Sequence, residues 1–164
     1  MKEDSARHSS ATGGERRMTA VSAAPPAPAA VPPAAQVGDR RRPCVLVVDD
    51  EPLVLALTAR MLRDADYLAV EAPNARQALQ LLERGEPAID LVLTDVVMPE
   101  TDGRTLGRLI AERYGGLPVA YMSAYPVNDV FHRGAPGPNL PFLSKPFLPD
   151  ALVAVVHELL ARLA

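Results

Sequence analysis

The sequence predicts an α/β protein, a three-layer α/β/α sandwich built on a parallel sheet. Short apolar runs of the length of buried strands occur at residues 44–48, 67–70, 89–94, 118–122 and 140–143. Longer segments lie between these runs, and their apolar residues recur at the spacing of an amphipathic helix. Strict alternation of strands and helices is typical of right-handed β/α units, which place helices on both faces of the sheet. We therefore expect five strands and about five helices.

Each helix is expected from its apolar spacing and from its ends. Pro52 and Pro149 stand where the first turn of a helix tolerates a missing N–H, and Asn74 is a candidate N-cap. The fourth helix is the weak one, because prolines and glycines between residues 126 and 138 leave room for about two turns around residues 128–132. The apolar stripes of the other helices are Val54, Leu57 and Met61; Ala75, Ala78, Leu79 and Leu82; Leu106, Leu109 and Ile110; and Leu152, Val155, Val156, Leu159 and Leu163.

Length and composition favour one folded domain behind a tail. The chain has 164 residues, of which 48% are hydrophobic, which is enough for one buried core and rather little for two. Residues 1–42 are rich in Ala, Pro, Ser and Arg and include no aromatic side chain, so burial there cannot offset the entropy of ordering. We expect a disordered tail over residues 1–42 and a folded domain over residues 43–164.

Charge and cysteine content exclude several classes of protein. Residues 1–42 carry 7 basic and 4 acidic side chains, and residues 43–164 carry 10 and 16, so the net charges are +3 and −6. An acidic body lacks the clustered Lys and Arg that nucleic acid requires. Cys44, the single cysteine, excludes an internal disulfide and fits a small buried hydrophobe. No segment resembles a membrane span or a leader peptide, so we expect a cytoplasmic protein without a membrane partner.

Polar side chains follow four of the five predicted strands. Asp49 and Asp50 follow the first strand, Asp95 the third and Ser123 the fourth, while Lys145 stands just beyond the fifth. Ligands of an open parallel sheet bind outside the carboxyl ends of its strands. The second strand delivers nothing that matches. If it lies at an edge, in the order 2-1-3-4-5, the four contributing strands are neighbours and their ends converge on one pocket.

A cation is expected in that pocket. Three carboxylates within about 4 Å of one another repel by roughly 4 kcal/mol per pair at an effective dielectric constant near 20. Carboxylate ligands without His or Cys favour Mg²⁺ over zinc. Together with Mg²⁺, Lys145 would neutralise the oxygens of a transferring phosphoryl group, and Ser123 would donate a hydrogen bond to it. An aspartate carboxylate then becomes a competent nucleophile toward phosphorus, and the product is an aspartyl phosphate.

Five short segments carry a resemblance to a known family. They are VVDDEP at residues 47–52, LTDVVMP at 93–99, DG at 102–103, MSA at 122–124 and SKPF at 144–147. In this order and spacing they resemble the receiver domain of two-component response regulators, and above all receivers associated with bacterial hybrid histidine kinases. The resemblance extends from Cys44 to about residue 163. It implies a flavodoxin-like (βα)5 fold with the strand order 2-1-3-4-5.

The resemblance also implies a phosphoacceptor and a set of metal ligands. Asp95 would be the residue that is phosphorylated. Asp50, Asp95 and the backbone carbonyl of Val97 would bind Mg²⁺ directly, and Asp49 would act largely through water. Ser123 and Lys145 would hold the phosphoryl oxygens.

A switch and a set of partners follow from the same resemblance. Phosphorylation would draw Ser123 inward and let Phe142, at the aromatic switch position, pack into the vacated space. The Lys145–Pro146 peptide would be cis. The phosphodonor would be the phosphohistidine of a sensor or hybrid histidine kinase, and a histidine phosphotransferase or another protein would act downstream. No output segment follows Ala164, so we expect a stand-alone receiver in a phosphorelay, which catalyses only its own phosphorylation and slow dephosphorylation.

Taken singly, these residues have simpler interpretations. Asp49 and Asp50 could cap the first helix, Asp95 could be a loop acid paired with Lys145, and Ser123 could be a turn residue. Their joint occurrence at adjacent strand ends favours the phosphoacceptor. Two other functions stay open. One is a Mg²⁺-dependent phosphohydrolase of the haloacid dehalogenase type, which wants a second Asp where Val97 stands; the other is a pseudo-receiver that only mediates contacts.

Two positions suggest that the phosphate is held for long. Val97 and Tyr125 come two residues after Asp95 and Ser123, and an apolar and a bulky side chain cannot readily orient a hydrolytic water. We therefore predict a long-lived aspartyl phosphate. The remaining polar candidates are expected to be solvated side chains: His132, His157, Arg104, Arg108 and Arg113.

Overall fold

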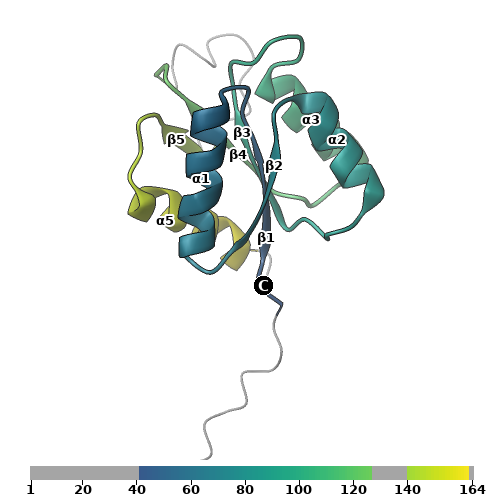
Figure 1. The fold of residues 1–164 in the computed structure, drawn as a ribbon. Helices are drawn as coiled ribbons and strands as arrows, with labels where there is room; N and C mark the ends of the chain where they lie inside the picture. The colour runs from purple at the N-terminus through teal and green to yellow at the C-terminus, as the bar shows by residue number, and fades with distance from the viewer. Residues whose placement is uncertain (1–40, 127–139, 163–164) are drawn as a thin grey trace, which may run out of the picture. The chain divides into compact units, whose positions relative to one another are not determined.

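The protein is a five-stranded parallel sheet covered by helices on both faces (Figure 1). The computed structural model describes residues 41–126 and 140–162. Its strands are β1 (Cys44–Val48), β2 (Leu68–Ala72), β3 (Leu91–Asp95), β4 (Val119–Ser123) and β5 (Phe142–Ser144), in the order β2-β1-β3-β4-β5. This architecture confirms the predicted fold class and strand order.

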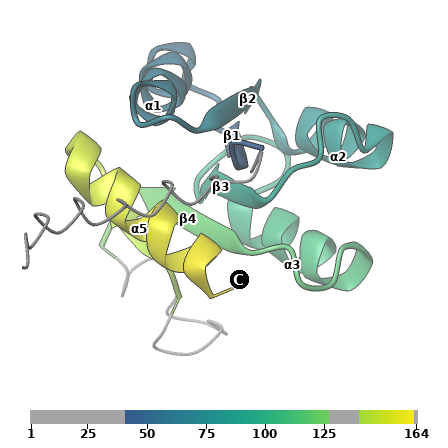
Figure 2. The ribbon, with the colours of Figure 1, turned by 90° about the horizontal axis from the view of Figure 1, so that it is seen from below.

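Four helices flank the sheet in the described segments. They are α1 (Pro52–Asp64), α2 (Ala75–Arg84), α3 (Gly103–Arg113) and α5 (Pro149–Ala161). Figure 2 shows α1 and α5 on one face of the sheet and α2 and α3 on the other. The predicted short helix around residues 128–132 and the predicted disorder of residues 1–40 lie outside the described residues.

Alternating side chains of the central strands divide the core in two. Val45 and Val47 of β1 pack in the cluster that includes residues of α1 and α5, whereas Leu46 and Val48 pack in the cluster that includes residues of α2 and α3. This follows from the two-residue period of a strand, which sends successive side chains to opposite faces. Because helices cover both faces, every residue of β1 is buried, including Cys44.

The apolar stripe of α1 differs from the one that spacing alone suggested. Leu55, Ala59 and Leu62 are buried, whereas Leu57 is 55% exposed. Nearly every residue in the first turns of α1 is apolar. The sequence is therefore compatible with two apolar stripes of helical spacing, and one of them is shifted by about one residue from the other. Packing against the sheet, rather than periodicity, decides between them.

Strands β2 to β5 begin and end one or two residues later than the apolar runs predicted. The shift matters at the carboxyl ends, because Asp95 and Ser123 become the last residues of β3 and β4. Backbone hydrogen bonds between strands can continue through a polar residue. A prediction from apolar residues alone therefore ends the strand too early. The polar side chains of the site are therefore fixed by the sheet itself.

Helix ends follow the predicted signals in part. Asn74 caps α2, since its side chain accepts a hydrogen bond of 2.9 Å from the N–H of Gln77, as predicted. Pro52 and Pro149 occupy the first turns of α1 and α5. Asp102 caps α3 by accepting a bond of 2.7 Å from the N–H of Thr105, and that cap was not predicted.

The described chain starts with two arginines that contact the domain. Arg41 binds Asp90 through two hydrogen bonds of 2.6 and 2.9 Å, and Arg42 lies 3.5 Å from Asp66. The Asp90 carboxylate also accepts a 2.7 Å bond from the N–H of Cys44. Asp90, the residue directly before β3, thereby holds Arg41 and the first residue of β1.

A close contact between α3 and β4 gives a stability test. A Cβ atom on Gly107 would lie 2.0 Å from the hydroxyl oxygen of Tyr121, a side chain that is 5% exposed. Gly107→Ala should therefore lower the free energy of unfolding by about 1–3 kcal/mol through overpacking. In the Tyr121→Phe background the same substitution should cost less, because the clashing oxygen is gone. Denaturant unfolding of the two single variants and the double variant measures this coupling; equal costs in both backgrounds would contradict it.

Candidate functional site

The predicted polar side chains gather at the carboxyl ends of the strands. Asp49 and Asp50 directly follow β1, Asp95 ends β3, Ser123 ends β4 and Lys145 directly follows β5. Strand β2 lies at the edge of the sheet, so the four contributing strands are neighbours. Extended pairing continues past β5, since the N–H of Lys145 donates to the carbonyl of Ser123 over 2.8 Å. The structure thus brings all five side chains together at the carboxyl ends of these four strands.

Three carboxylates form the acidic part of the site. Asp49 is fully buried and Asp95 is 8% exposed, whereas Asp50 is exposed. One carboxylate oxygen from each of the three lies within 4.8 Å of the others. An all-oxygen cluster of this kind, with one member open to solvent, is suited to a hard divalent cation that keeps water ligands.

Lys145 provides the positive charge inside this cluster. Its ammonium nitrogen lies 2.6 Å from Oδ2 of Asp49 and 3.3 Å from Oδ1 of Asp95, and its side chain is 15% exposed. The simpler interpretation, a pair of Asp95 with Lys145 alone, does not describe the contact, because the shorter distance is to Asp49. The Lys145–Pro146 peptide is cis, as predicted.

Backbone hydrogen bonds orient the two buried carboxylates. Oδ1 of Asp95 accepts a 2.9 Å bond from the N–H of Val96, and Oδ1 of Asp49 accepts a 3.0 Å bond from the N–H of Glu51. Glu51 is the N-cap residue of α1, and its side chain makes no capping hydrogen bond. The other oxygen of Asp49, Oδ2, contacts Lys145 in the site. Neither Asp49 nor Asp50 is the N-cap residue of α1, so the helix-capping interpretation of these two residues is wrong.

The electrostatic environment of Asp95 opposes its ionisation. Burial is the main cause that raises the pKa of Asp95 above its usual value, and the charge of Asp49 adds to it. The ammonium group of Lys145 and the hydrogen bond from Val96 act in the opposite direction and offset only part of the increase. A cation added to the cluster would lower this pKa and favour the carboxylate form.

Ser123 and Phe142 lie on the same face of the sheet. Ser123 is fully buried, and its Oγ accepts a 3.0 Å hydrogen bond from the N–H of Tyr125. Phe142 is half-buried on β5 and is paired in register with Tyr121 of β4. Tyr121, in turn, packs with Val96, the residue directly after Asp95, and Phe142 packs against this pair. Val96, directly after Asp95, and Phe142 of β5 therefore belong to one small apolar cluster.

Val97 and Tyr125, which come two residues after Asp95 and Ser123, have 53% and 58% of their surfaces exposed. The other predicted solvated side chains behave as expected where they are described: Arg104, Arg108, Arg113 and His157 are exposed. His132 lies outside the described residues.

Two further residues contact the backbone of Asp95. Thr94 is fully buried, and its hydroxyl donates a 2.9 Å hydrogen bond to the backbone carbonyl of Asp95. Gly103 approaches the same carbonyl so closely that a Cβ atom would lie 2.0 Å from its oxygen. Both residues lie in the segments LTDVVMP and DG, but the sequence pattern assigns neither of them a role in the site.

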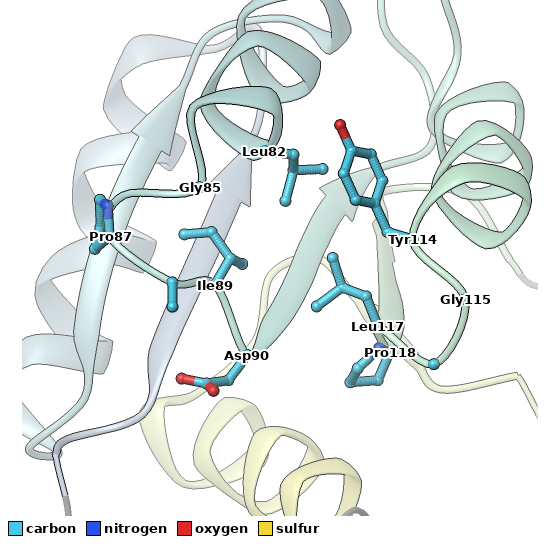
Figure 3. A pocket seen from close by; sticks show the side chains of 11 residues that line it. Leu82, Gly85, Pro87, Ile89, Asp90, Tyr114, Gly115, Leu117 and Pro118 are labelled. Carbon is cyan, nitrogen blue, oxygen red and sulfur yellow. The ribbon is translucent and has the colours of Figure 1, made fainter.

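A separate pocket lies at the amino ends of the strands, at the end of the sheet opposite these polar side chains. It is formed by the ends of α2 and α3 and by the segments that lead into β3 and β4. Figure 3 shows Leu82, Ile89, Tyr114 and Leu117 around it. Its lining is largely apolar, and its carboxylate, Asp90, is already bound by Arg41.

A doubly wound parallel sheet with an acidic cluster, a lysine and a buried serine at the carboxyl ends of its strands is typical of α/β proteins whose ligand site lies at that end of the sheet. Residues 45–157 match the family of response regulator receiver domains, and the chain belongs to this family. Receiver domains take phosphoryl groups from histidine kinases and bind Mg²⁺ in an acidic pocket.

Individual relatives agree with this assignment. The chain is 35% identical to the sensor kinase CckA of Brucella abortus over 119 residues, which are 72% of this chain and 12% of the kinase. It is 38% identical to the response regulator Rre1 of Synechocystis sp. over 121 residues, which are 72% of this chain and 52% of that protein. The chain thus spans only part of each relative, so their length does not test the expectation of a stand-alone receiver.

Solved structures resemble the chain over its domain. The receiver domain from the hybrid histidine kinase CckA is 32% identical, with a TM-score of 0.59, and the match covers 71% of this chain and 98% of that one. A response regulator receiver protein from Sinorhizobium medicae is 29% identical, with a TM-score of 0.64 and coverage of 73% and 95%.

Within the described segments, no helix combines the length and the apolarity that a bilayer crossing needs.

The raised pKa of Asp95 predicts how a substitution changes stability. The folded protein retains a proton on Asp95 at pH values at which the unfolded chain has lost it, so ionisation of Asp95 opposes folding at neutral pH. Asp95→Asn should therefore raise the midpoint of thermal unfolding in EDTA. The gain should shrink as the pH falls through the pKa of Asp95, because the wild-type carboxyl group is then neutral as well. Thermal melts of wild type and variant from pH 4 to pH 8, about the range in which such groups titrate, measure it.

Glu112→Gln provides the control for that experiment, since Glu112 is an exposed acid on α3. It should leave the midpoint nearly unchanged at every pH. A variant at Asp95 that melts below the wild type in EDTA would contradict the electrostatic account.

Proposed function

We propose that this chain is a phosphoacceptor receiver of a two-component phosphorelay, in which Asp95 accepts a phosphoryl group from the phosphohistidine of a sensor or hybrid histidine kinase. The observation that carries the proposal is the position of Asp95: a nearly buried carboxylate between the ammonium group of Lys145 and two further carboxylates. Phosphorylation is expected to change a protein-binding face, which a downstream protein or a histidine phosphotransferase would read.

The donor set fits Mg²⁺. In this proposal Asp50, Asp95 and the backbone carbonyl of Val97 hold the ion directly, and Asp49 acts through water. The cluster offers carboxylate oxygens and, among the described residues, contains neither His nor Cys, as a hard cation prefers. When bound, Mg²⁺ supplies charge neutralisation for the carboxylates and for the oxygens of the incoming phosphoryl group.

The chain's own residues position the transfer. A carboxylate oxygen of Asp95 forms the new bond to phosphorus while the bond from phosphorus to the histidine nitrogen breaks, and the imidazole leaves with that electron pair. The N–H of Val96 holds the Asp95 carboxylate in place. Lys145 is close enough to Asp95, at 3.3 Å, to move onto a phosphoryl oxygen as negative charge accumulates there.

Ser123 is the proposed sensor of the phosphoryl group. Its Oγ accepts a hydrogen bond from Tyr125, so its O–H can donate to a phosphoryl oxygen. A shift of Ser123 toward Asp95 would change the packing above Phe142, which shares its face of the sheet. Phe142 is therefore the proposed switch residue, and the population of its inward position is what phosphorylation would alter.

An exposed apolar surface beside the pocket supports a protein as the phosphodonor. Leu53 and Leu57 lie one turn apart on α1, which begins directly after Asp49, Asp50 and Glu51, and they are 80% and 55% exposed. Large apolar side chains that stay in solvent near a site are typical of surfaces that contact another protein.

Phosphorylation of the purified protein tests the proposal. Incubation with acetyl phosphate and Mg²⁺ should increase the intact mass by one phosphoryl group, and Asp95→Asn or EDTA should abolish the increase. Beryllofluoride, which mimics the phosphoryl group, should bind only in the presence of Mg²⁺. Absence of any mass increase and of beryllofluoride binding in the wild type would favour a pseudo-receiver that only mediates contacts.

The lifetime of the phosphate is a second test. Val97 and Tyr125, two residues after Asp95 and Ser123, are exposed, and neither side chain readily orients a water for hydrolysis of the acyl phosphate. Val97→Asn should therefore accelerate the loss of phosphate by about tenfold, less than the roughly hundredfold or more of full general acid–base catalysis, because the amide only orients the water. Loss of phosphate from the isolated phosphoprotein, followed by intact mass in Mg²⁺ at neutral pH, measures this; rapid loss from the wild type that Val97→Asn leaves unchanged would contradict it.

A further inference from the structure

The start of α3 contacts the backbone that carries the phosphoacceptor. The N–H of Gly103 donates a 2.9 Å hydrogen bond to the carbonyl of Val96. One residue earlier, the carbonyl of Asp95 accepts the hydroxyl of Thr94 over 2.9 Å. The carbonyls of Asp95 and Val96 are thus held by a buried threonine and by the first residue of α3, respectively.

Gly103 leaves no room between α3 and Asp95. A Cβ atom on Gly103 would lie 2.0 Å from the carbonyl oxygen of Asp95, 2.9 Å from its carbonyl carbon and 3.0 Å from Oγ1 of Thr94. These neighbours are backbone atoms and a short buried side chain, so they cannot move aside without moving β3 or α3. Glycine is required here for space, and its contact is with the peptide group of the phosphoacceptor itself.

This backbone segment fixes the groups that the proposed chemistry needs. The N–H of Val96 holds the Asp95 carboxylate at 2.9 Å and also donates to the carbonyl of Met122 on β4 over 2.9 Å. Any displacement of the Asp95 peptide therefore moves the carboxylate relative to Lys145 and Asp49. It also moves the carbonyl of Val97, two residues on, which is the proposed metal ligand.

We propose that Gly103 is a positioning residue for phosphorylation: the missing side chain lets α3 seat against the Asp95 peptide and so sets the geometry of the metal and phosphoryl site. The inference rests on the proposed function and adds a residue that touches neither metal nor phosphate. Misplacement of reacting groups by about 1 Å can lower a rate by roughly a hundredfold. A Cβ atom at 2.0 Å from a carbonyl oxygen demands a displacement of that order.

Gly103→Ala tests the proposal, with Gly107→Ala as its matched control. Both glycines lie on α3, and in both an added Cβ atom would lie 2.0 Å from an oxygen, but the second oxygen is the hydroxyl of Tyr121 rather than the Asp95 carbonyl. Calorimetric Mg²⁺ titration and the rate of phosphorylation by acetyl phosphate at saturating Mg²⁺ are compared at a temperature at which both variants are folded. We expect Gly103→Ala to lower the Mg²⁺ affinity and the rate by about tenfold or more, and Gly107→Ala to change each less than about twofold.

A second pair of variants decides the question if Gly103→Ala does not fold. Thr94→Val removes the hydroxyl that holds the Asp95 carbonyl, and Thr94→Ser keeps it. The proposal requires a weaker Mg²⁺ affinity in the valine variant and a nearly normal one in the serine variant. Normal Mg²⁺ affinity and rate in a folded Gly103→Ala, or in Thr94→Val where Gly103→Ala is unfolded, would overturn it. A wild-type protein that is not phosphorylated would instead count against the proposed function.

Discussion

The ammonium group of Lys145 between two buried carboxylates is the interaction on which the site depends. Asp49 and Asp95 lose nearly all contact with water, and at separations of about 4 Å such charges repel by roughly 4 kcal/mol per pair at an effective dielectric constant near 20. One lysine cannot balance three acids, so the folded chain keeps an excess of negative charge at the edge of the sheet. That excess of negative charge favours the binding of a cation, and of a ligand that carries one, at this end of the sheet.

Most of the fold could be predicted because parallel sheets impose a strong pattern on sequence. Strands covered on both faces are continuous apolar runs, and the polar residues directly after them all meet at one edge. The gathering of Asp49, Asp50, Asp95, Ser123 and Lys145 follows from that rule once β2 lies at an edge of the sheet, and the family resemblance implied that strand order. Local pattern did not fix the strand ends, since backbone pairing continues through polar residues, nor the inward face of α1, where Leu55 is buried and Leu57 is exposed.

Contacts between distant segments explain what the sequence could not predict about the site. The shorter distance from Lys145 to Asp49 than to Asp95 depends on how the chain leaves β5, and no spacing rule encodes it. The close approaches of Gly103 to Asp95 and of Gly107 to Tyr121 both arise from the seating of α3 on the sheet. In the sequence these glycines look like weak helix residues; in the fold they are points where a helix touches a strand.

The burial of Cys44 has a practical consequence. The chain contains a single thiol, and it lies at the start of a central strand with no exposed surface, where burial and the charge of Asp90 raise its pKa. Both effects suppress the reactive thiolate. Modification of this sulfur by a thiol reagent therefore requires at least the start of β1 to separate from its neighbours, and the rate of labelling reports that opening in a protein that carries no tryptophan to serve as an optical probe.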